Sequence, residues 1–286
     1  MHTFAYARPA TVAEALAILA EHGPDARVLA GGTDLVIRLR DGSLRPRVVV
    51  DIKRIAELGP GIRVADGRLV IAATTVMAEI AADERVRRDF TALAEAAAVV
   101  GSVQIRNRAT LAGNVCNASP AADTAPSLLV YGAEVVAAGP AGVRRFPVDD
   151  LFVRSGVTTL APAELVTAIE LPIPAGRLGA AHARRTRRRG HDLASVTLAV
   201  AVDAAGVTRL AYGSVGPRPV LVVEESGVLA DAAAPDAATA PVFERLFAAA
   251  SPSPRSMRAG PEYRLAMLRV LGGRALRTAI ARLAGE

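Results

Sequence analysis

The chain has 286 residues, of which 51% are hydrophobic, and carries a formal net charge of +6. This length suits two or three domains with cores that need neither a disulfide nor a metal. No apolar run reaches the roughly 18 residues of a membrane-spanning helix, and the first ten residues lack the apolar core of a signal peptide. The single cysteine, Cys116, excludes an internal disulfide and a cysteine-built iron–sulfur site. We therefore expect a soluble, cytoplasmic protein.

The first 55 residues predict a small α/β unit. Thr11 and Glu14 have the spacing of a capping box, in which the hydroxyl accepts from the Glu14 amide and the carboxylate accepts from the Thr11 amide. The helix that follows would end at Gly23. Short strands are predicted over 27–30 and 48–52, with a helical turn over 34–40 between them.

The middle of the chain alternates strand and helix patterns. A strand is predicted over 69–73, and helices over 75–82 and 89–100, the second capped by Asp89 and ended by Gly101. An apolar stretch over 127–131 precedes a strand over 133–138, and residues 149–152 turn the chain. Pro172 and Pro174, followed by Gly176 and Gly179, predict a domain boundary.

The last third of the chain begins with a hairpin pattern. Its strands are predicted over 196–202 and 207–215, joined by a turn at 204–206. Residues 231–241 read as an alanine-rich linker or loop, and 243–250 as a helix. A last helix is predicted over 261–283, in which Gly272 and Gly273 would introduce a break or kink.

Two stretches of small polar residues stand out between the apolar segments. The first is LAGGTDL, residues 29–35, where backbone N–H groups after a strand could bind a pyrophosphate. An ordinary tight turn is the alternative interpretation. The second is IRNRATLAGNVCNASPAAD, residues 105–123, whose glycine, amide and hydroxyl groups suit a large, partly anionic ligand. Its alternative is a connecting loop rich in Asx turns. Two such stretches suggest one cofactor held from two sides.

Other candidate groups have simpler explanations. Cys116 could be a reactive thiol, but the sequence favours a small filler beside a binding loop, because no histidine or lysine lies nearby in the sequence to activate it. The arginine cluster over 184–189 could contact an anion, or it could protect an exposed edge strand from association. Nucleic-acid binding lacks aromatic interleaving and any known signature, and the four histidines have no metal-ligand spacing. No nucleophile elbow or HExxH motif supports a hydrolase.

The ordered motifs resemble those of a known family, the FAD-binding medium subunits of molybdenum hydroxylases, which include xanthine dehydrogenase and aerobic carbon monoxide dehydrogenase. The resemblance runs from FAYARP (4–9) through LAGGTDL and SVQIRNRATLAGNVCNASPAADTAPSLL (102–129) to RGHDLA (189–194) and GPEYR (260–264). It implies an α+β fold, with a two-subdomain FAD-binding fold of the vanillyl-alcohol-oxidase (PCMH) type and a C-terminal α+β domain with a small antiparallel sheet. The implied units are an N-terminal FAD-binding subdomain (1–55), a second FAD-binding subdomain (56–174) and a C-terminal flavoprotein domain (175–286).

The resemblance also implies where non-covalent FAD would bind. Residues 30–35 would lie along the pyrophosphate, with the amides of residues 31–34 as donors. Thr110, Gly113 and Asn114 would contact the pyrophosphate and adenosine side, and Arg184 would approach the flavin where many relatives carry lysine. Ser119, Ala122 and Asp123 would line the ribityl and ring side. The complete candidate site comprises Leu29, Ala30, Gly31, Gly32, Thr33, Asp34, Leu35, Ile105, Asn107, Thr110, Gly113, Asn114, Ser119, Ala122, Asp123 and Arg184.

By the same resemblance, the chain is an oxidoreductase subunit with no catalytic or metal-binding residues of its own. Electrons would pass from [2Fe–2S] clusters through FAD to an external acceptor, which could be NAD⁺, oxygen or a quinone. The implied partners are a molybdenum-cofactor large subunit and a [2Fe–2S] small subunit, in a dimer of heterotrimers, without nucleic acid or membrane insertion. A stand-alone FAD-dependent oxidase is the alternative function, and a non-enzymatic assembly protein is a third.

Overall fold

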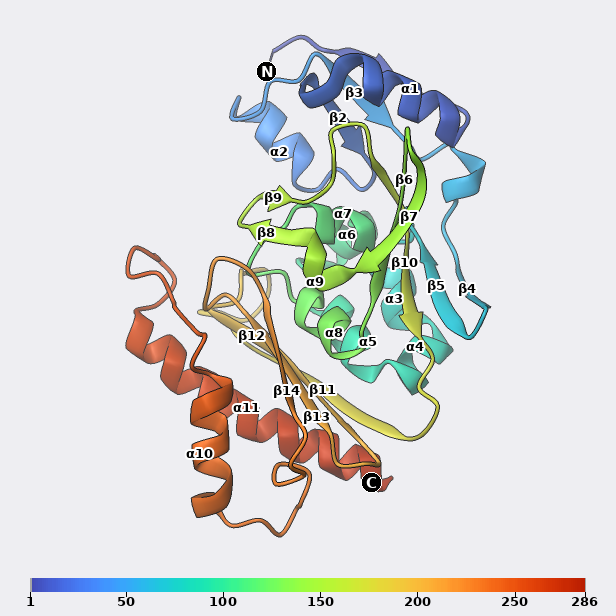
Figure 1. Cartoon of the computed structure of the whole chain (residues 1–286). Coiled ribbons are helices and arrows are strands. Elements are labelled where there is room, and N and C mark those ends of the chain that lie inside the picture. Colours follow the sequence, from blue (N-terminus) through green and yellow to red (C-terminus); the bar gives the residue numbers. More distant parts are fainter. Residues whose placement is uncertain (1, 286) are drawn as a thin grey trace.

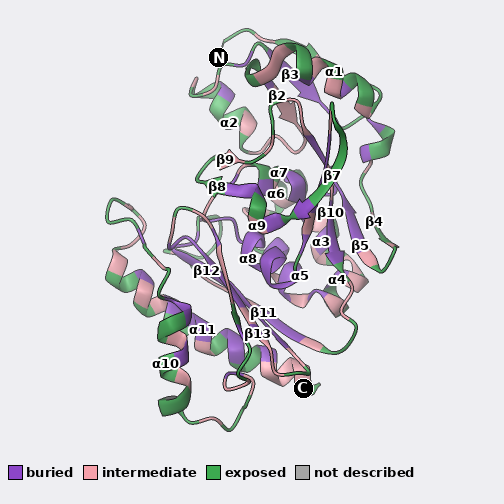
Figure 2. Cartoon of the chain, viewed as in Figure 1, coloured by how far each residue is buried: buried purple, intermediate pink, exposed green. Residues whose placement is uncertain are grey.

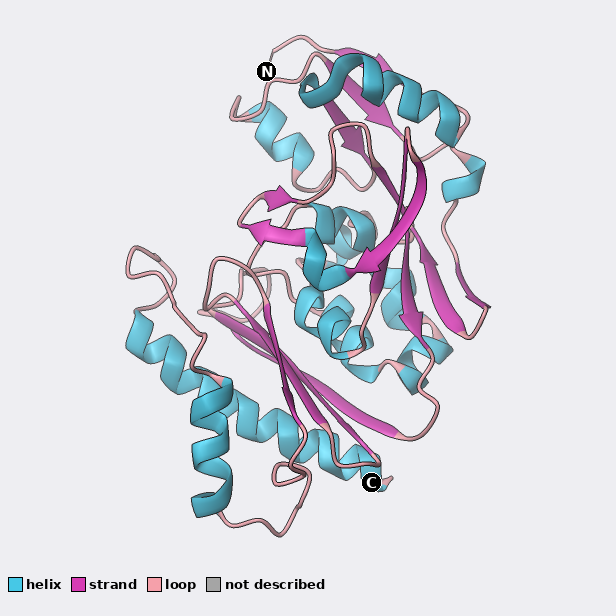
Figure 3. Cartoon of the chain, viewed as in Figure 1, coloured by secondary structure: helices cyan, strands magenta, loops and turns pink. Residues whose placement is uncertain are grey.

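The computed structural model describes residues 2–285, and the chain folds into three successive α+β units (Figures 1 and 3). The first contains a three-stranded parallel sheet in the order β1 (Ala5–Ala7), β3 (Val48–Asp51), β2 (Ala26–Leu29). Helix α1 (Val12–His22) covers this sheet, because Ala15 and Leu19 pack against Val48 and Val50. Helix α2 (Leu35–Arg40) follows the Gly31–Gly32 turn. Two single 3₁₀ turns, η1 (Gly23–Asp25) and η2 (Ala56–Leu58), lie before β2 and after β3.

The predicted capping box at the start of α1 is half right. Thr11 Oγ1 accepts from the Glu14 amide at 3.1 Å, as expected. The Glu14 carboxylate, however, accepts from the amide of Ala10 at 2.7 Å, one residue before the predicted donor. The helix still begins at its predicted position, because the Thr11 hydroxyl accepts from the unpaired Glu14 amide of its first turn.

The middle unit has a five-stranded antiparallel sheet, with a group of short helices between it and the last unit (Figure 1). The sheet order is β4 (Ile62–Ala65), β5 (Arg68–Ala72), β10 (Leu165–Pro172), β6 (Glu134–Gly139), β7 (Gly142–Pro147). The helices are α3 (Met77–Ala82), α4 (Glu84–Asp89), α5 (Thr91–Ala98), α6 (Val103–Arg106), α7 (Leu111–Cys116), α8 (Thr124–Val130) and α9 (Val148–Leu151). A two-stranded ribbon, β8 (Phe152–Arg154) and β9 (Val157–Thr158), follows α9.

Two predictions for this unit are wrong in detail, and so is the alternative interpretation of residues 105–123 as a connecting loop. Asp89 does not cap the second helix, since it is the last residue of α4. The cap in this region is Asp83, whose carboxylate accepts from the amides of Arg85 and Val86 at 2.9 and 3.1 Å. The segment over 105–123 is not a plain loop, because caps at Ser102 and Thr110 start the short helices α6 and α7. The turn predicted over 149–152 is mostly the end of α9.

The last unit is a four-stranded antiparallel sheet enclosed between helices. Its order is β11 (Leu178–Arg185), β12 (Val196–Asp203), β13 (Thr208–Gly213), β14 (Val220–Glu224). One face packs on α10 (Asp236–Leu246) and α11 (Pro261–Ala284), and the other face joins the core of the middle unit. Figure 2 shows the buried residues gathered along these contacts, and every residue of α8 is buried.

The predictions for the C-terminal helices need two corrections. Half of the region predicted as a linker, 231–241, belongs to α10, which begins at Asp236 and contains Pro241. Helix α11 continues unbroken through Gly272 and Gly273 for 24 residues. Gly272 is needed there for packing, because a Cβ at this position would lie 2.9 Å from the ring of Phe247. Among the helices of residues 2–285, none combines the length and the apolar composition needed to cross a lipid bilayer.

Candidate functional site

The two small-residue stretches predicted to bind a ligand face each other across one cavity. The cavity has a volume of about 280 Å³ and lies between the Gly31–Gly32 turn, helix α7 and the start of β10. The predicted site residues that line it are Ala30, Gly31, Gly32, Thr33, Asp34, Leu35, Thr110, Gly113 and Asn114. Segments nearly 80 residues apart in the sequence therefore form opposite walls of one cavity.

The first wall depends on two glycines with different roles. Gly32 has a positive φ of 75°, which a residue with a Cβ adopts only with strain. Gly31 packs so closely on the second stretch that a Cβ there would lie 2.1 Å from the carbonyl oxygen of Arg108. Asp34 follows at the N-terminus of α2, and removal from water raises the pKa of its carboxyl, although Arg38 partly opposes this shift.

The second wall is the N-terminal part of α7. Thr110 Oγ1 accepts from the Gly113 amide at 3.1 Å and so caps the helix. Asn114 lies one position further on, and its Oδ1 accepts from the hydroxyl of Thr124 at 2.6 Å. This hydrogen bond connects the cavity wall to the start of α8, directly beside Asp123.

Two arginines at the cavity were not predicted from the sequence. Arg27 on β2 and Arg38 on α2 both line it. Burial and the neighbouring charge of Arg38 lower the pKa of Arg27, although a guanidinium stays charged at neutral pH. The sequence signal that could have identified both arginines was their position on either side of the Gly31–Gly32 turn. A strand and a helix that meet at one turn place their side chains at the same end of the sheet.

Several predicted residues lie away from this cavity. Leu29 packs against the turn, and its Cδ1 lies 2.8 Å from the position that a Cβ on Gly32 would take. Ile105 packs on Gly101, and Asn107 is the exposed C-cap of α6. Ser119 Oγ accepts from the Ala121 amide at 3.3 Å, and Ala122 is buried.

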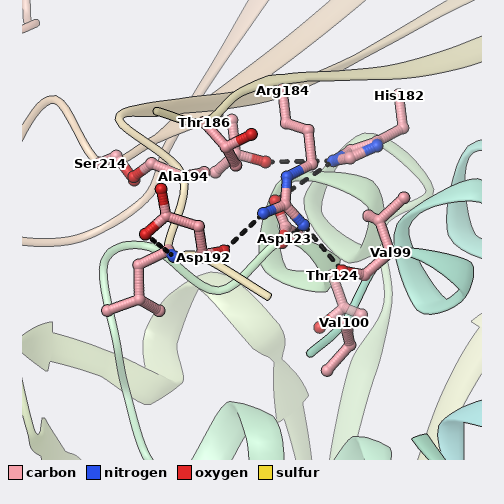
Figure 4. A network of polar contacts seen from close by, with 12 residues as sticks. Val99, Val100, Asp123, Thr124, His182, Arg184, Thr186, Asp192, Ala194 and Ser214 are labelled. Carbon is pink, nitrogen blue, oxygen red and sulfur yellow. Dashed lines mark hydrogen bonds and ion pairs between the residues drawn. The ribbon is translucent and has the colours of Figure 1, made fainter. Parts of the chain in front are cut away.

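The remaining predicted residues, Asp123 and Arg184, form a buried ion pair between the middle and last units (Figure 4). Arg184 Nη1 donates to Asp123 Oδ2 at 2.8 Å and to the Val99 carbonyl at 2.7 Å, and its Nη2 donates to the Asp192 carbonyl at 2.6 Å. Only 14% of the Arg184 side chain and 8% of the Asp123 side chain are exposed. Arg184 therefore lies on edge strand β11 but is not the solvated edge arginine of the simpler interpretation.

Comparisons with known proteins agree with this arrangement. The family described as "FAD binding domain in molybdopterin dehydrogenase" matches residues 2–174, and the "CO dehydrogenase flavoprotein C-terminal domain" matches residues 181–279. The chain belongs to the FAD-binding medium subunits of the molybdenum hydroxylases. Asp123 lies in the first matched domain and Arg184 in the second, so the buried ion pair joins the two domains of a medium subunit.

Similar medium subunits match over nearly the whole chain. The xanthine dehydrogenase FAD-binding subunit of Escherichia coli O157:H7 is 32% identical over 98% of this chain and 97% of its own length. The carbon monoxide dehydrogenase medium chain of Hydrogenophaga pseudoflava is also 32% identical, over 98% of each chain. A solved structure of reconstituted CO dehydrogenase from Oligotropha carboxidovorans superposes with a TM-score of 0.91 at 29% identity, covering 98% of this chain and 99% of the other. These matches confirm the predicted fold and family.

Proposed function

We propose that this chain binds FAD in the cavity between the Gly31–Gly32 turn and α7, and serves as the flavin subunit through which a molybdenum hydroxylase passes electrons to an external acceptor. The observation that carries this proposal is the facing pair of small-residue walls, in a chain whose full length matches FAD-binding subunits. Neither wall alone separates a cofactor site from an ordinary turn, whereas one cavity lined by both supports a ligand held from two sides.

The cavity fits the pyrophosphate part of a dinucleotide. Gly31 and Gly32 bring backbone to the cavity wall, where the amides of residues 31–34 would be the donors, and Arg27 and Arg38 add positive charge to that wall. Thr110, Gly113 and Asn114 would face the same group from α7. FAD is longer than this cavity, so its flavin end must extend beyond it.

The flavin end would lie towards Asp123 and Arg184. The hydrogen bond between Asn114 and Thr124 places Asp123 one residue from a contact of the cavity wall. Ser119 and Ala122 lie on the same connection between α7 and α8, and would line the ribityl chain. The fixed ion pair of Asp123 and Arg184 would hold one negative and one positive group in a set geometry beside the ring.

Bound FAD would supply the redox chemistry, while the protein binds it, orients it and shields it from water. The chain would receive electrons from a [2Fe–2S] small subunit that is itself reduced by a molybdenum-cofactor large subunit, in a dimer of heterotrimers. Relatives of equal identity bear the names of xanthine and carbon monoxide dehydrogenases, so we assign the choice of substrate to the large subunit. We also propose the three units 1–55, 56–174 and 175–286, and a cytoplasmic location.

The absorption spectrum of the purified full chain tests the cofactor, followed by identification of the chromophore that heat releases. We expect flavin bands and released FAD. Replacing Gly113 by valine should abolish FAD retention, because the new side chain fills ligand space at the cavity wall and its Cβ would lie 2.9 Å from the capping Thr110 hydroxyl, which must shift. Gly273→Val in α11 is the matched control, since it adds the same side chain to a helix far from the cavity.

Two results would contradict the proposal. A colourless chain that takes up no added FAD, alone or with its partners, would exclude a flavin subunit. Stoichiometric FAD in Gly113→Val would exclude this placement of the ligand. Co-purification with molybdenum and iron–sulfur subunits separates the proposed subunit from the alternative, a stand-alone FAD-dependent oxidase, which would oxidise its own substrate without them.

A further inference from the structure

In the buried ion pair of Asp123 and Arg184, the two carboxylate oxygens of Asp123 differ in their hydrogen bonding. Asp123 Oδ2 accepts from Arg184, whereas Oδ1 is fully buried and has no hydrogen-bond partner among residues 2–285. The nearest cationic candidate is His182, whose Nε2 lies 3.7 Å from this oxygen. A buried carboxylate oxygen without a donor is costly, so the site contains an unused acceptor that faces a titratable ring.

His182 is held firmly beside this acceptor. Only 3% of its side chain is exposed, and it lies on the same face of β11 as Arg184, two residues away. Its backbone amide donates to Glu95 Oε2 at 2.9 Å, and its Nε2 lies 3.1 Å from the hydroxyl oxygen of Thr197 on β12. Figure 4 shows the imidazole and the guanidinium approaching Asp123 from the same strand.

The contacts of Nε2 differ between the two protonation states of His182. In the neutral tautomer that carries its hydrogen on Nδ1, Nε2 can accept from the Thr197 hydroxyl, and Asp123 Oδ1 keeps no donor. In the protonated ring, Nε2 carries a hydrogen and can donate to Oδ1 after a small approach from 3.7 Å. With a neutral ring, the ionised Asp123 and Arg184 balance each other, so a proton on His182 adds one positive charge to the buried site.

That extra charge becomes favourable when negative charge arrives nearby. Two electrons from an iron–sulfur partner and one proton from solvent would leave bound FAD with one added negative charge. We propose that His182 takes up one further proton from solvent when FAD is reduced, so that two electrons enter the site together with two protons, one on the flavin and one on the imidazole. This inference rests on the proposed placement of the flavin beside Asp123 and Arg184.

The direction of the pH effect follows from linkage. Negative charge on the reduced flavin favours the protonated imidazole, and by reciprocity a protonated His182 favours the reduced flavin. Lowering the pH should therefore raise the flavin midpoint potential more steeply in the wild type than in a variant without this ring. His182 is a positioning and proton-holding group, and the electrons do not pass through it.

The charged groups around His182 come from every element packed on it. Asp123 faces the ring from the segment before α8, Glu95 approaches from α5, and Arg184 lies on β11 itself. Arg282 of α11 pairs with Glu95 and donates to the Ala180 carbonyl at 2.6 Å, so its charge is already balanced. Asp192 contributes its carbonyl to Arg184, while its carboxylate pairs with Arg187. Asp123 is therefore the acidic group that would accept a hydrogen bond from a protonated His182 ring.

The test is the number of protons taken up when the FAD-loaded full chain is reduced in weakly buffered solution containing a pH indicator. We expect the wild type to take up more protons per two electrons than His182→Gln, by as much as one. His191→Gln is the control, because His191 is an exposed histidine in the neighbouring loop, and it should match the wild type. Equal proton uptake by the wild type and His182→Gln, both loaded with FAD, would overturn this inference and leave the proposed function unaffected.

A second measurement, on the wild type alone, replaces the comparison if His182→Gln fails to hold FAD. The ¹⁵N shifts of the His182 ring in the wild type report its protonation directly in the oxidised and reduced states. A change from neutral to protonated on reduction supports the inference, and an unchanged ring overturns it. A wild-type chain that binds no FAD, alone or with its partners, overturns the proposed function, and this inference is lost with it.

Discussion

The Cα of Gly31 lies against the backbone carbonyl of Arg108, so that a Cβ on Gly31 would stand only 2.1 Å from the carbonyl oxygen. This contact brings the first small-residue stretch within reach of the second, although 77 positions separate the two residues. The close approach of two backbones explains why glycine is required at position 31, where φ is ordinary, as well as at Gly32, where φ is positive.

Gly31→Ala should separate the two walls of the cavity. A backbone oxygen cannot move aside as a flexible side chain can, and overpacking of this kind costs about 1–3 kcal/mol. We expect FAD affinity to fall about tenfold or more, with the helical content unchanged, as measured by flavin fluorescence titration and circular dichroism. Gly176→Ala is the matched control, because a Cβ there meets no atom within 4 Å. Equal affinities in the two variants would mean that the loop contact does not shape the site.

Cys116 offers a chemical probe of the same cavity. Cys116 is exposed and lines the cavity, where desolvation by the surrounding protein raises the pKa of its thiol. The reactive thiolate is therefore scarcer than in the unfolded chain, and at pH 8 we expect alkylation by iodoacetamide to be slower than in the urea-unfolded chain. Saturating FAD should slow the reaction further by covering the thiol. Because the chain has a single cysteine, mass spectrometry reads the result directly, and an alkylation rate that FAD leaves unchanged would place the ligand elsewhere.

Local chemistry in the sequence predicted most elements but not every helix boundary. Thr11 marked the start of α1 correctly, because a hydroxyl before an apolar helical pattern has few other roles. Asp89 was a plausible cap on the same grounds, yet Asp83 is the residue that caps, and the chain turns at Phe90 instead. Two acidic residues six positions apart are equivalent as caps, and only the packing of Phe90 in the core decides between them.

The part of the candidate site that is formed by backbone could be predicted from the sequence. Glycines and small polar residues indicate a close backbone approach, and the two stretches over 29–35 and 105–123 do line one cavity. The roles of Arg27 and His182 were hidden, because a charged residue in a strand shows its partner only when the strand is placed. His182 meets Asp123 across 59 positions, between two units that fold on separate sheets. The pairing depends on how the last sheet packs against α5 and α8, which no local pattern encodes.

Arg184→Ala should destabilise the fold as well as the flavin site. It would leave the Asp123 carboxylate buried without its cation, and would remove donors from the Val99 and Asp192 carbonyls. Loss of one partner from a buried pair costs about 3–5 kcal/mol. Urea unfolding measures the change, with Arg189→Ala as the control, because Arg189 is an exposed arginine of the same cluster. A loss below about 0.5 kcal/mol would show that Asp123 does not depend on this arginine.

Asp192 should make the loop after β11 sensitive to acid. Its hydrogen bond with Arg187 holds the pKa of the Asp192 carboxyl well below its usual value, and only 3% of the side chain is exposed. A lowered pKa in the folded state stabilises the protein above the unfolded value of about 3.9, and this contribution is lost as the pH falls below it. The thermal midpoint of the wild type should therefore drop more steeply below about pH 4 than that of Asp192→Asn, which cannot titrate. Asp150→Asn, at an exposed site, should follow the wild type. Parallel curves for wild type and Asp192→Asn would mean that the ion pair with Arg187 contributes nothing to the stability of this loop.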